Sequence, residues 1–380
     1  MFHSLRSFIV GDILAITSAI KFLKRESFIL YFNNAKGPRV IHFGFLAFIG
    51  ILISHYSYHY SNSICVITLA YILLFDLFSI FVSGLAIWIE NNKDVKDNYF
   101  GYQRYEVLAI FTATVLSQIS ALFIIKEAIE RYLTGSTVDE SGLGVVAILS
   151  LIIHLLITYN VENKALNKVI ETSTSSWLQE HITDISEGVC HFIPSLSSLL
   201  LPRINPVNLL GTISALIVFG VNLLMKYEFS ANVDNIGAFV ISLMIIATMT
   251  PLSVLSGRTL LQTCPSHLVS QIDKALRSAS TFEGVLEIQK EHFWNLGFHE
   301  VVGSVHVRVR RDANEQLVLA HVTNKLLPLV QKLTIQVFKD NWTRASSNVI
   351  YNFSKEPRSN PFSSDLSDNL PDLITNVAAK

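Results

Sequence analysis

The run SICVITLAYILLFDLFSIFVSGLAIWI, residues 63–89, contains 27 residues and a single charged side chain, Asp76. A helix needs about 20 apolar residues to cross a bilayer, so this run predicts a membrane span. A carboxylate at the centre of a span costs about 2.5–3.5 kcal/mol. We therefore expect Asp76 to face an ion, a polar pathway or a polar partner. The alternative is a neutral, hydrogen-bonded Asp76 that only holds two helices together.

The composition favours a membrane protein with several spans and a smaller polar domain. Of the 380 residues, 50% are hydrophobic, and the mean hydropathy is +0.42, which is high for a soluble protein. The net charge of -1 gives no reason to expect a nucleic-acid partner. The sequence contains no nucleophile elbow, phosphate loop or HExxH motif, so we do not expect an enzyme.

Five further apolar segments have the length and composition of membrane spans. They are residues 40–56, 105–125, 143–159, 207–225 and 233–251. Together with residues 63–89 they predict a six-span transmembrane domain over residues 40–257, preceded by a cytosolic N-terminal arm at 1–39. The Lys126–Gly142 stretch between the third and fourth spans is interpreted as a turn.

A serine-rich loop at 160–205 separates the fourth span from the fifth. Within it, residues 185–201 are apolar, but Glu187, His191 and Pro194 interrupt them. We expect residues 176–201 to form an interfacial or re-entrant segment, because an even number of spans leaves both termini on one side. A seventh span at this place is the alternative, and it would put the termini on opposite sides.

The pattern after residue 258 favours a small cytosolic domain over residues 258–342. Helical spacing at 266–280 and 315–330 alternates with strand-like residues at 285–296, 304–310 and 334–339. This α-β-β-α-β order predicts a ferredoxin-like α+β fold. Residues 343–380 are rich in Ser, Asn, Pro and Asp and predict a disordered tail.

The string FGYQRYEVL, residues 100–108, places a glycine turn before a helix, with Arg104 and Glu106 at the membrane surface. It resembles the opening of the third span in the cation diffusion facilitator family of zinc transporters. The strings SWLQE (176–180), EHFW (291–294) and RRDANEQ (310–316) extend the resemblance, which covers about residues 40–340. It implies six spans followed by a cytosolic dimerisation domain.

The resemblance also implies a zinc site with four ligands, from a His-x-x-x-Asp motif in the second span and another in the fifth. Zinc prefers four ligands in a tetrahedron. In the second span Asp76 matches the acidic position, while Ile72 stands at the histidine position. Counting back from Asp234, at the start of the sixth span, places Val207 and Gly211 at the ligand positions of the fifth. We therefore expect a degenerate site in which Asp76 is the single surviving metal-ligand position.

A rival acidic site depends on the topology of the serine-rich loop. If residues 176–201 were the fifth span, Glu180 and Asp184 would form an all-oxygen site with Asp76. His181 lies about 100° around the helix from Glu180, so it would not complete this set. The alternative is a solvated, polar helix start on a loop.

Histidines elsewhere leave two further alternatives open. His55 and His59 share one helix face and offer two imidazoles to a metal, but the tyrosines around them fit an interfacial aromatic belt equally well. The histidines of the C-terminal region fit either a regulatory zinc site or ordinary surface and core positions; they are His267, His292, His299, His306 and His321.

The resemblance and the missing ligands together imply an auxiliary, transport-incompetent subunit of a heterodimeric zinc/proton antiporter. Its partner would be a transport-competent relative resembling zinc transporter 5. The complex would reside in the Golgi or trans-Golgi network membrane, with both termini cytosolic, and zinc would be its transported ion rather than a cofactor. Two rivals stay open: an active homodimeric zinc transporter that uses Asp76, Glu180 and Asp184, and a membrane scaffold or sensor without transport.

Overall fold

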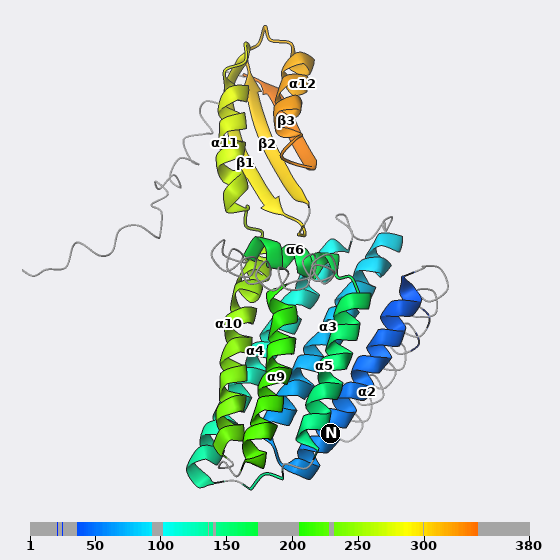
Figure 1. Cartoon of the computed structure of the whole chain (residues 1–380). Coiled ribbons are helices and arrows are strands. Elements are labelled where there is room, and N and C mark those ends of the chain that lie inside the picture. Colours follow the sequence, from blue (N-terminus) through cyan, green and yellow to red (C-terminus); the bar gives the residue numbers. More distant parts are fainter. Residues whose placement is uncertain are drawn as a thin grey trace, which may run out of the picture.

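In the part of the chain that the structure describes, six long apolar helices form a bundle, and a small α+β domain follows them in the chain (Figure 1). The computed structural model describes residues 36–92, 102–135, 137–139, 142–173, 205–227, 232–298 and 300–340, together with Lys21 and Arg25. Each of the six helices is long and apolar enough to cross a membrane. They are α2 (Gly37–Ser61), α3 (Ile64–Asn91), α4 (Gln103–Thr134), α5 (Leu143–Asn160), α9 (Pro206–Lys226) and α10 (Asn232–Leu260). All six predicted spans are present among the described residues, which confirms the predicted fold class.

Helix α3 lies at the centre of the bundle. In an apolar stretch of 18 residues from α3, 61% is buried inside the protein, compared with 22–44% in the corresponding stretches of the other five spans. It packs against each of the other five spans, α2, α4, α5, α9 and α10. A residue on α3 is therefore well placed to meet side chains from several other spans.

Two helices, α4 and α10, extend nine residues beyond their predicted C-terminal ends. Helix α4 continues to Thr134, because the ion pairs Lys126–Glu130 (2.9 Å) and Glu127–Arg131 (2.8 Å) support another two turns. The first half of the predicted turn at 126–142 is thus helical. Helix α10 runs through Pro251 to Leu260.

A short helix, α6 (Lys164–Ser173), lies across the end of the bundle nearest the C-terminal domain (Figure 1). Its apolar face, formed by Ala165, Leu166, Val169 and Ile170, is buried against the spans. The sequence interpretation assigned these residues to a polar loop. The apolar residues follow helical spacing over only ten residues, so the surrounding serines and charges obscured the pattern.

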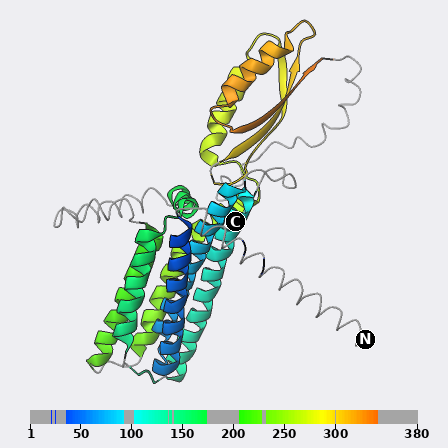
Figure 2. The same cartoon turned by 90° about the vertical axis from the view of Figure 1, so that its right-hand side faces the viewer.

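The C-terminal domain has the predicted α-β-β-α-β order. It consists of α11 (Ser266–Ser280), β1 (Val285–Asn295), β2 (Val301–Val309), α12 (Glu315–Leu326) and β3 (Lys332–Lys339). Strand β2 lies in the middle of the sheet, antiparallel to β1 and parallel to β3. The two helices pack on the same face of this sheet (Figure 2). The buried valines of β2 and the apolar face of α12 form the core; they are Val305, Val307, Val309, Val318, Val322 and Leu326.

Several sequence-based expectations lie outside the described residues. These are most of the N-terminal arm at 1–39, the segment 176–201 and the tail at 343–380. The rival ligands Glu180 and Asp184, together with His181, belong to the same undescribed part. These expectations, and the domain boundaries that depend on them, stay predictions.

Candidate metal site in the helical bundle

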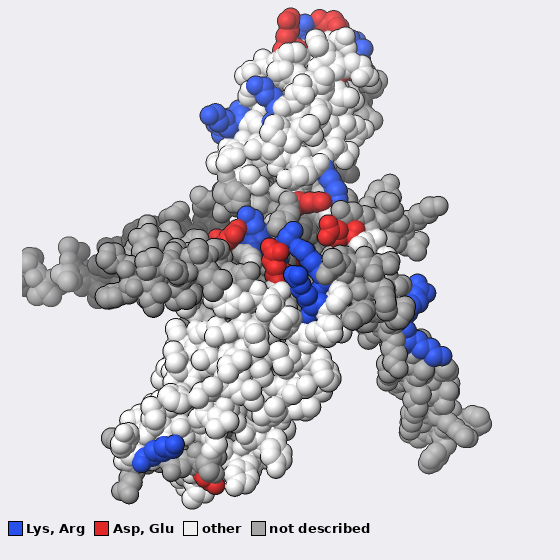
Figure 3. Space-filling view, turned by 45° about the vertical axis from the view of Figure 1, so that its right-hand side comes forward, with Lys and Arg blue, Asp and Glu red and all other residues white. Residues whose placement is uncertain are grey.

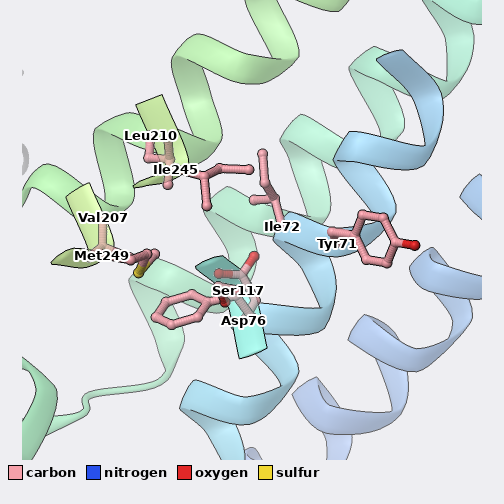
Figure 4. A pocket seen from close by; sticks show the side chains of 9 residues that line it. Tyr71, Ile72, Asp76, Ser117, Val207, Leu210, Ile245 and Met249 are labelled. Atoms are coloured by element: carbon pink, nitrogen blue, oxygen red, sulfur yellow. The ribbon is translucent and has the colours of Figure 1, made fainter. Parts of the chain in front are cut away.

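Asp76 lies on α3 with only 6% of its surface exposed. It lines a small cavity of about 10 Å³, which has room for about one water molecule. Figure 4 shows the carboxylate among side chains that are mostly apolar. The apolar side chains that line the cavity with it are Ile72, Phe75, Val207, Leu210, Ile245 and Met249.

The cavity brings together three of the four positions to which the family resemblance assigns ligands. Ile72 and Asp76 reach it from α3, and Val207 reaches it from α9. Val207, which the count back from Asp234 selected in the fifth span, therefore lies beside Ile72 and Asp76 of the second span. Ile72 and Val207 present only methyl and methylene groups to this space, which leaves the carboxylate without the two expected imidazoles. The metal role of Asp76 itself stays a prediction.

A histidine from the fourth span supplies the polar contact of Asp76. The Nδ1 atom of His154, on α5, lies 2.7 Å from the Oδ2 atom of Asp76. Its Nε2 atom lies 3.1 Å from the backbone carbonyl oxygen of Asn208, on α9. The His154 side chain is only 3% exposed. These contacts join α3, α5 and α9 at one buried point.

The contact with Asn208 determines how protons are arranged on this pair. A carbonyl oxygen can only accept, so the Nε2 atom of His154 carries a hydrogen and donates it. The contact between Nδ1 and the Asp76 carboxyl group then contains one further proton, on either the imidazole or the carboxyl group. The pair has no net charge in both arrangements. Neither imidazole nitrogen keeps a free lone pair for a metal ion.

Gly211 leaves the space that this imidazole occupies. A Cβ atom at position 211 would collide with the Nε2 and Cε1 atoms of His154 and would lie 2.7 Å from its Cδ2 atom. Position 211 is where the family resemblance assigns the second aspartate. His154 therefore fills the space that the side chain of this fourth ligand would need.

The sequence interpretation did not identify His154. The signal was present, because a histidine within the apolar run LSLIIHLLI, residues 149–157, is a polar side chain at membrane depth. Its partner was not predictable from spacing, since the facing positions depend on how α3, α5 and α9 pack. Asp76 nevertheless contacts a polar partner, which is one of the three surroundings expected for a charged residue within the second span.

Asp234, used above to align the fifth span, has a structural role of its own. Its carboxylate accepts hydrogen bonds from the Ser63 hydroxyl at 2.6 Å and the Ile64 amide at 2.7 Å. The Cys65 amide lies at 3.4 Å. These are donors at the first turn of α3, which a helix leaves without internal partners. A residue at the start of α10 therefore caps the central helix.

Residues 102–108 of the FGYQRYEVL string lie where the bundle meets the C-terminal domain. The amide oxygen of Gln262, turned toward Arg104, accepts from the guanidinium Nη1 atom at 3.0 Å and so joins the start of α4 to the end of α10. Gly297, in the β1–β2 turn, packs against the Gln103 side chain of α4. Phe298 packs against the apolar core of the bundle. The described part of this string thus connects the bundle to the C-terminal domain.

Among the described residues, no group of three or more His, Cys, Asp or Glu side chains is placed to hold a metal ion. In the C-terminal domain His321 stacks on Phe282, with ring centroids 4.0 Å apart. His292 and His306 make separate edge contacts with Trp294 and Phe338. The His267 side chain and His299 are not described, so the regulatory zinc site in this domain stays an open alternative.

Comparison with known proteins matches the cation efflux transmembrane domain to residues 40–261. The chain is 46% identical over 286 residues to zinc transporter 6 of Danio rerio, an alignment that covers 75% of this chain and 59% of that protein. It is 46% identical over 284 residues to zinc transporter 6 of Gallus gallus, covering 75% of this chain and 62% of the relative. The figures for zinc transporter 6 of Homo sapiens are 45% over 284 residues, with the same 75% and 62% coverage. The chain thus spans 59–62% of the length of these curated relatives.

Proposed function

Because the chain belongs to the cation efflux family, we propose that it is an auxiliary subunit of a heterodimeric zinc/proton antiporter and transports no zinc by itself. Its partner is a transport-competent member of the family that resembles zinc transporter 5. The complex moves cytosolic zinc into the lumen of the early secretory pathway in exchange for protons. Zinc is the proposed ion because the matched relatives are named zinc transporters.

The closed contact between Asp76 and His154 is the observation that carries this proposal. A zinc ion gives up its water only to a set of ligands with free lone pairs, usually four in a tetrahedron. Here one carboxylate is already hydrogen-bonded to an imidazole, and that imidazole is hydrogen-bonded on both sides. Ile72 and Val207 add no lone pair. The contact between Asp76 and His154 therefore stabilises the bundle and does not bind zinc.

The proposed orientation places both termini in the cytosol and the complex in Golgi or trans-Golgi network membrane. Six spans return the chain to the side on which it entered, and cytosolic ends of spans are enriched in Lys and Arg. Figure 3 shows charged side chains gathered between the bundle and the C-terminal domain. Basic residues near the span ends on this side are Lys36, Arg39, Arg104, Lys164, Lys168 and Arg258, against Lys126, Arg131 and Lys226 at the opposite end.

Reconstitution tests the proposal directly. The purified chain, the purified partner and the complex are placed in proton-loaded vesicles with a zinc-sensitive dye, and uptake is compared at equal protein content. We expect uptake by the complex and none by this chain alone. Substitution of the partner's own ligands should abolish uptake, whereas Asp76→Ala in this chain should leave uptake by the complex nearly unchanged.

Two other outcomes would favour the rival functions. Robust uptake by this chain alone, abolished by Asp76→Ala, Glu180→Ala and Asp184→Ala separately, would establish the homodimeric transporter with an all-oxygen site. Recovery of the endogenous chain without any copurifying transporter would favour a scaffold or sensor. Epitope tags at Met1 and Lys380 that differ in accessibility in selectively permeabilised cells would contradict the six-span orientation.

A further inference from the structure

We propose that His55 and His59 form a surface site for a divalent transition-metal ion, preferentially Zn²⁺, at the end of the bundle opposite the C-terminal domain. Both residues lie in the last two turns of α2, and both are exposed. The site is separate from the closed contact of Asp76 with His154, and it needs no residue of the rival acidic site.

The distance between the two ring nitrogens suits a shared metal ion. The Nε2 atoms of His55 and His59 lie 3.2 Å apart, and the two rings are nearly perpendicular, at 88°. Zinc binds imidazole nitrogen at about 2.0–2.1 Å with tetrahedral geometry, so two of its ligands lie about 3.3–3.4 Å apart. The two Nε2 atoms therefore already lie at about the separation that one zinc ion requires of two ligands. Water molecules would complete the tetrahedron.

The site lies at the polar boundary of the membrane and not within its apolar core. Helix α2 begins beside Arg39, and His55 follows sixteen residues later, which corresponds to about 24 Å of helix. The Arg131 guanidinium, on α4, lies at the same depth in the membrane as the two histidines, because its Nη2 atom donates to the Tyr58 hydroxyl at 3.1 Å. The exposed Tyr56 and Tyr60 are typical of a membrane interface. Water and ions thus have access to both imidazoles.

The neighbouring charges do not prevent a cation from binding. The Arg131 charge is balanced by Glu127, whose carboxylate lies 2.8 Å from its Nε atom. The Tyr58 ring lies between Arg131 and the histidines, with its centroid 5.9 Å from the guanidinium carbon and 5.3 Å from the His59 ring. Neutral imidazole is a preferred ligand of Zn²⁺ and Cu²⁺. The chemistry thus selects borderline transition metals over Ca²⁺ or Mg²⁺.

The side on which the site lies follows from the proposed function. If the C-terminal domain is cytosolic, His55 and His59 face the lumen, where the complex releases zinc. A two-histidine site with exchangeable water ligands holds zinc less firmly than a four-ligand site. It would therefore act as a transient acceptor for released zinc and not as a permanent structural site.

A metal titration of the purified full chain in lipid nanodiscs tests this inference. Zn²⁺ binding is measured by competition with a fluorescent chelator, and the Cu²⁺ complex is examined by electron paramagnetic resonance for two coupled imidazole nitrogens. Loss of even an outer-shell partner costs about 10–100-fold in metal affinity. His55→Ala and His59→Ala should therefore each weaken binding at least about tenfold, whereas His42→Ala, on the same helix, should not.

The outcomes separate this inference from the proposed function. Zn²⁺ binding that is unchanged in both His55→Ala and His59→Ala, or absent from the unsubstituted chain, would overturn the surface site alone. Binding that survives both substitutions but is lost in Asp76→Asn would overturn the surface site and the closed bundle site together. Thermal unfolding of each apo variant in parallel verifies that lost binding is not lost folding.

Discussion

The His154 imidazole lies directly against Gly211, in space that any side chain at position 211 would occupy. The position of the His154 ring, from the fourth span, thus requires that residue 211 of the fifth span has no side chain. The same imidazole links Asp76 to Asn208. Gly211 and the His154 imidazole are consequently parts of one packing arrangement.

Gly211→Ala should destabilise the bundle, because the new Cβ displaces the imidazole from its hydrogen bonds. Overpacking of this kind costs about 1–3 kcal/mol, which outweighs the benefit of alanine in a helix. The matched control is Gly220→Ala on the same helix, where a Cβ meets nothing within 4 Å. Thermal unfolding in detergent measures both. A melting temperature for Gly211→Ala equal to that of Gly220→Ala would show that His154 is not confined at this point.

His154→Ala should destabilise the protein more than Asp76→Ala. Without the imidazole, the buried Asp76 carboxyl group loses the hydrogen bond that His154 makes to it, and a buried polar group without a partner is costly. Without the carboxylate, the His154 imidazole still donates to the Asn208 carbonyl, so it keeps one of its two hydrogen bonds. Thermal unfolding of both variants and of the double variant gives the order and the coupling energy. The reverse order would contradict the interpretation that Asp76 depends on His154 for its polar contact while His154 keeps a second one at Asn208.

The sequence predicted the spans and the C-terminal domain well, because a long apolar run or an alternating pattern, as in β2, is enough to predict a single helix or strand. Contacts between different helices could not be predicted in the same way. Asp76 was recognisable as a charge that needs a partner, but its partner depends on the packing of α5 against α3 and α9. Val207, which the count back from Asp234 assigned to a ligand position, lines the cavity with Asp76. Helix α6 was missed because four apolar residues among charges and serines form a weak pattern.

Asp234→Ala should lower stability by about 3 kcal/mol or more, because hydrogen bonds to a charged group contribute about 1.5–3 kcal/mol each. This substitution removes the acceptor for the Ser63 hydroxyl and the Ile64 amide. Ser63→Ala removes one of these bonds and should cost less, while Asp234→Asn retains one oxygen acceptor and should be intermediate. Thermal unfolding of the three variants in the same detergent checks the order. An Asp234→Ala variant as stable as Ser63→Ala would refute the capping role.

The metal site should be recoverable by substitution, but only if His154 is also removed. Ile72→His, Val207→His and Gly211→Asp restore the four-ligand pattern around the cavity that Asp76, Ile72 and Val207 already line. The new aspartate needs the space of the His154 imidazole, so we expect zinc binding from the variant that also carries His154→Ala. Competition with a zinc chelator on the purified protein measures the gain.

The control is the triple substitution with His154 retained, which should bind zinc weakly and unfold at a lower temperature because the aspartate and the imidazole compete for one volume. Tetrahedral zinc requires all four donors to approach within about 2.0–2.2 Å, and an imidazole in that space prevents the approach of the fifth-span carboxylate. The His55→Ala substitution is included in both proteins, so that a surface site does not contribute to the measured binding. Equal zinc affinity with and without His154 would show that the missing ligands alone, and not the imidazole, close the site.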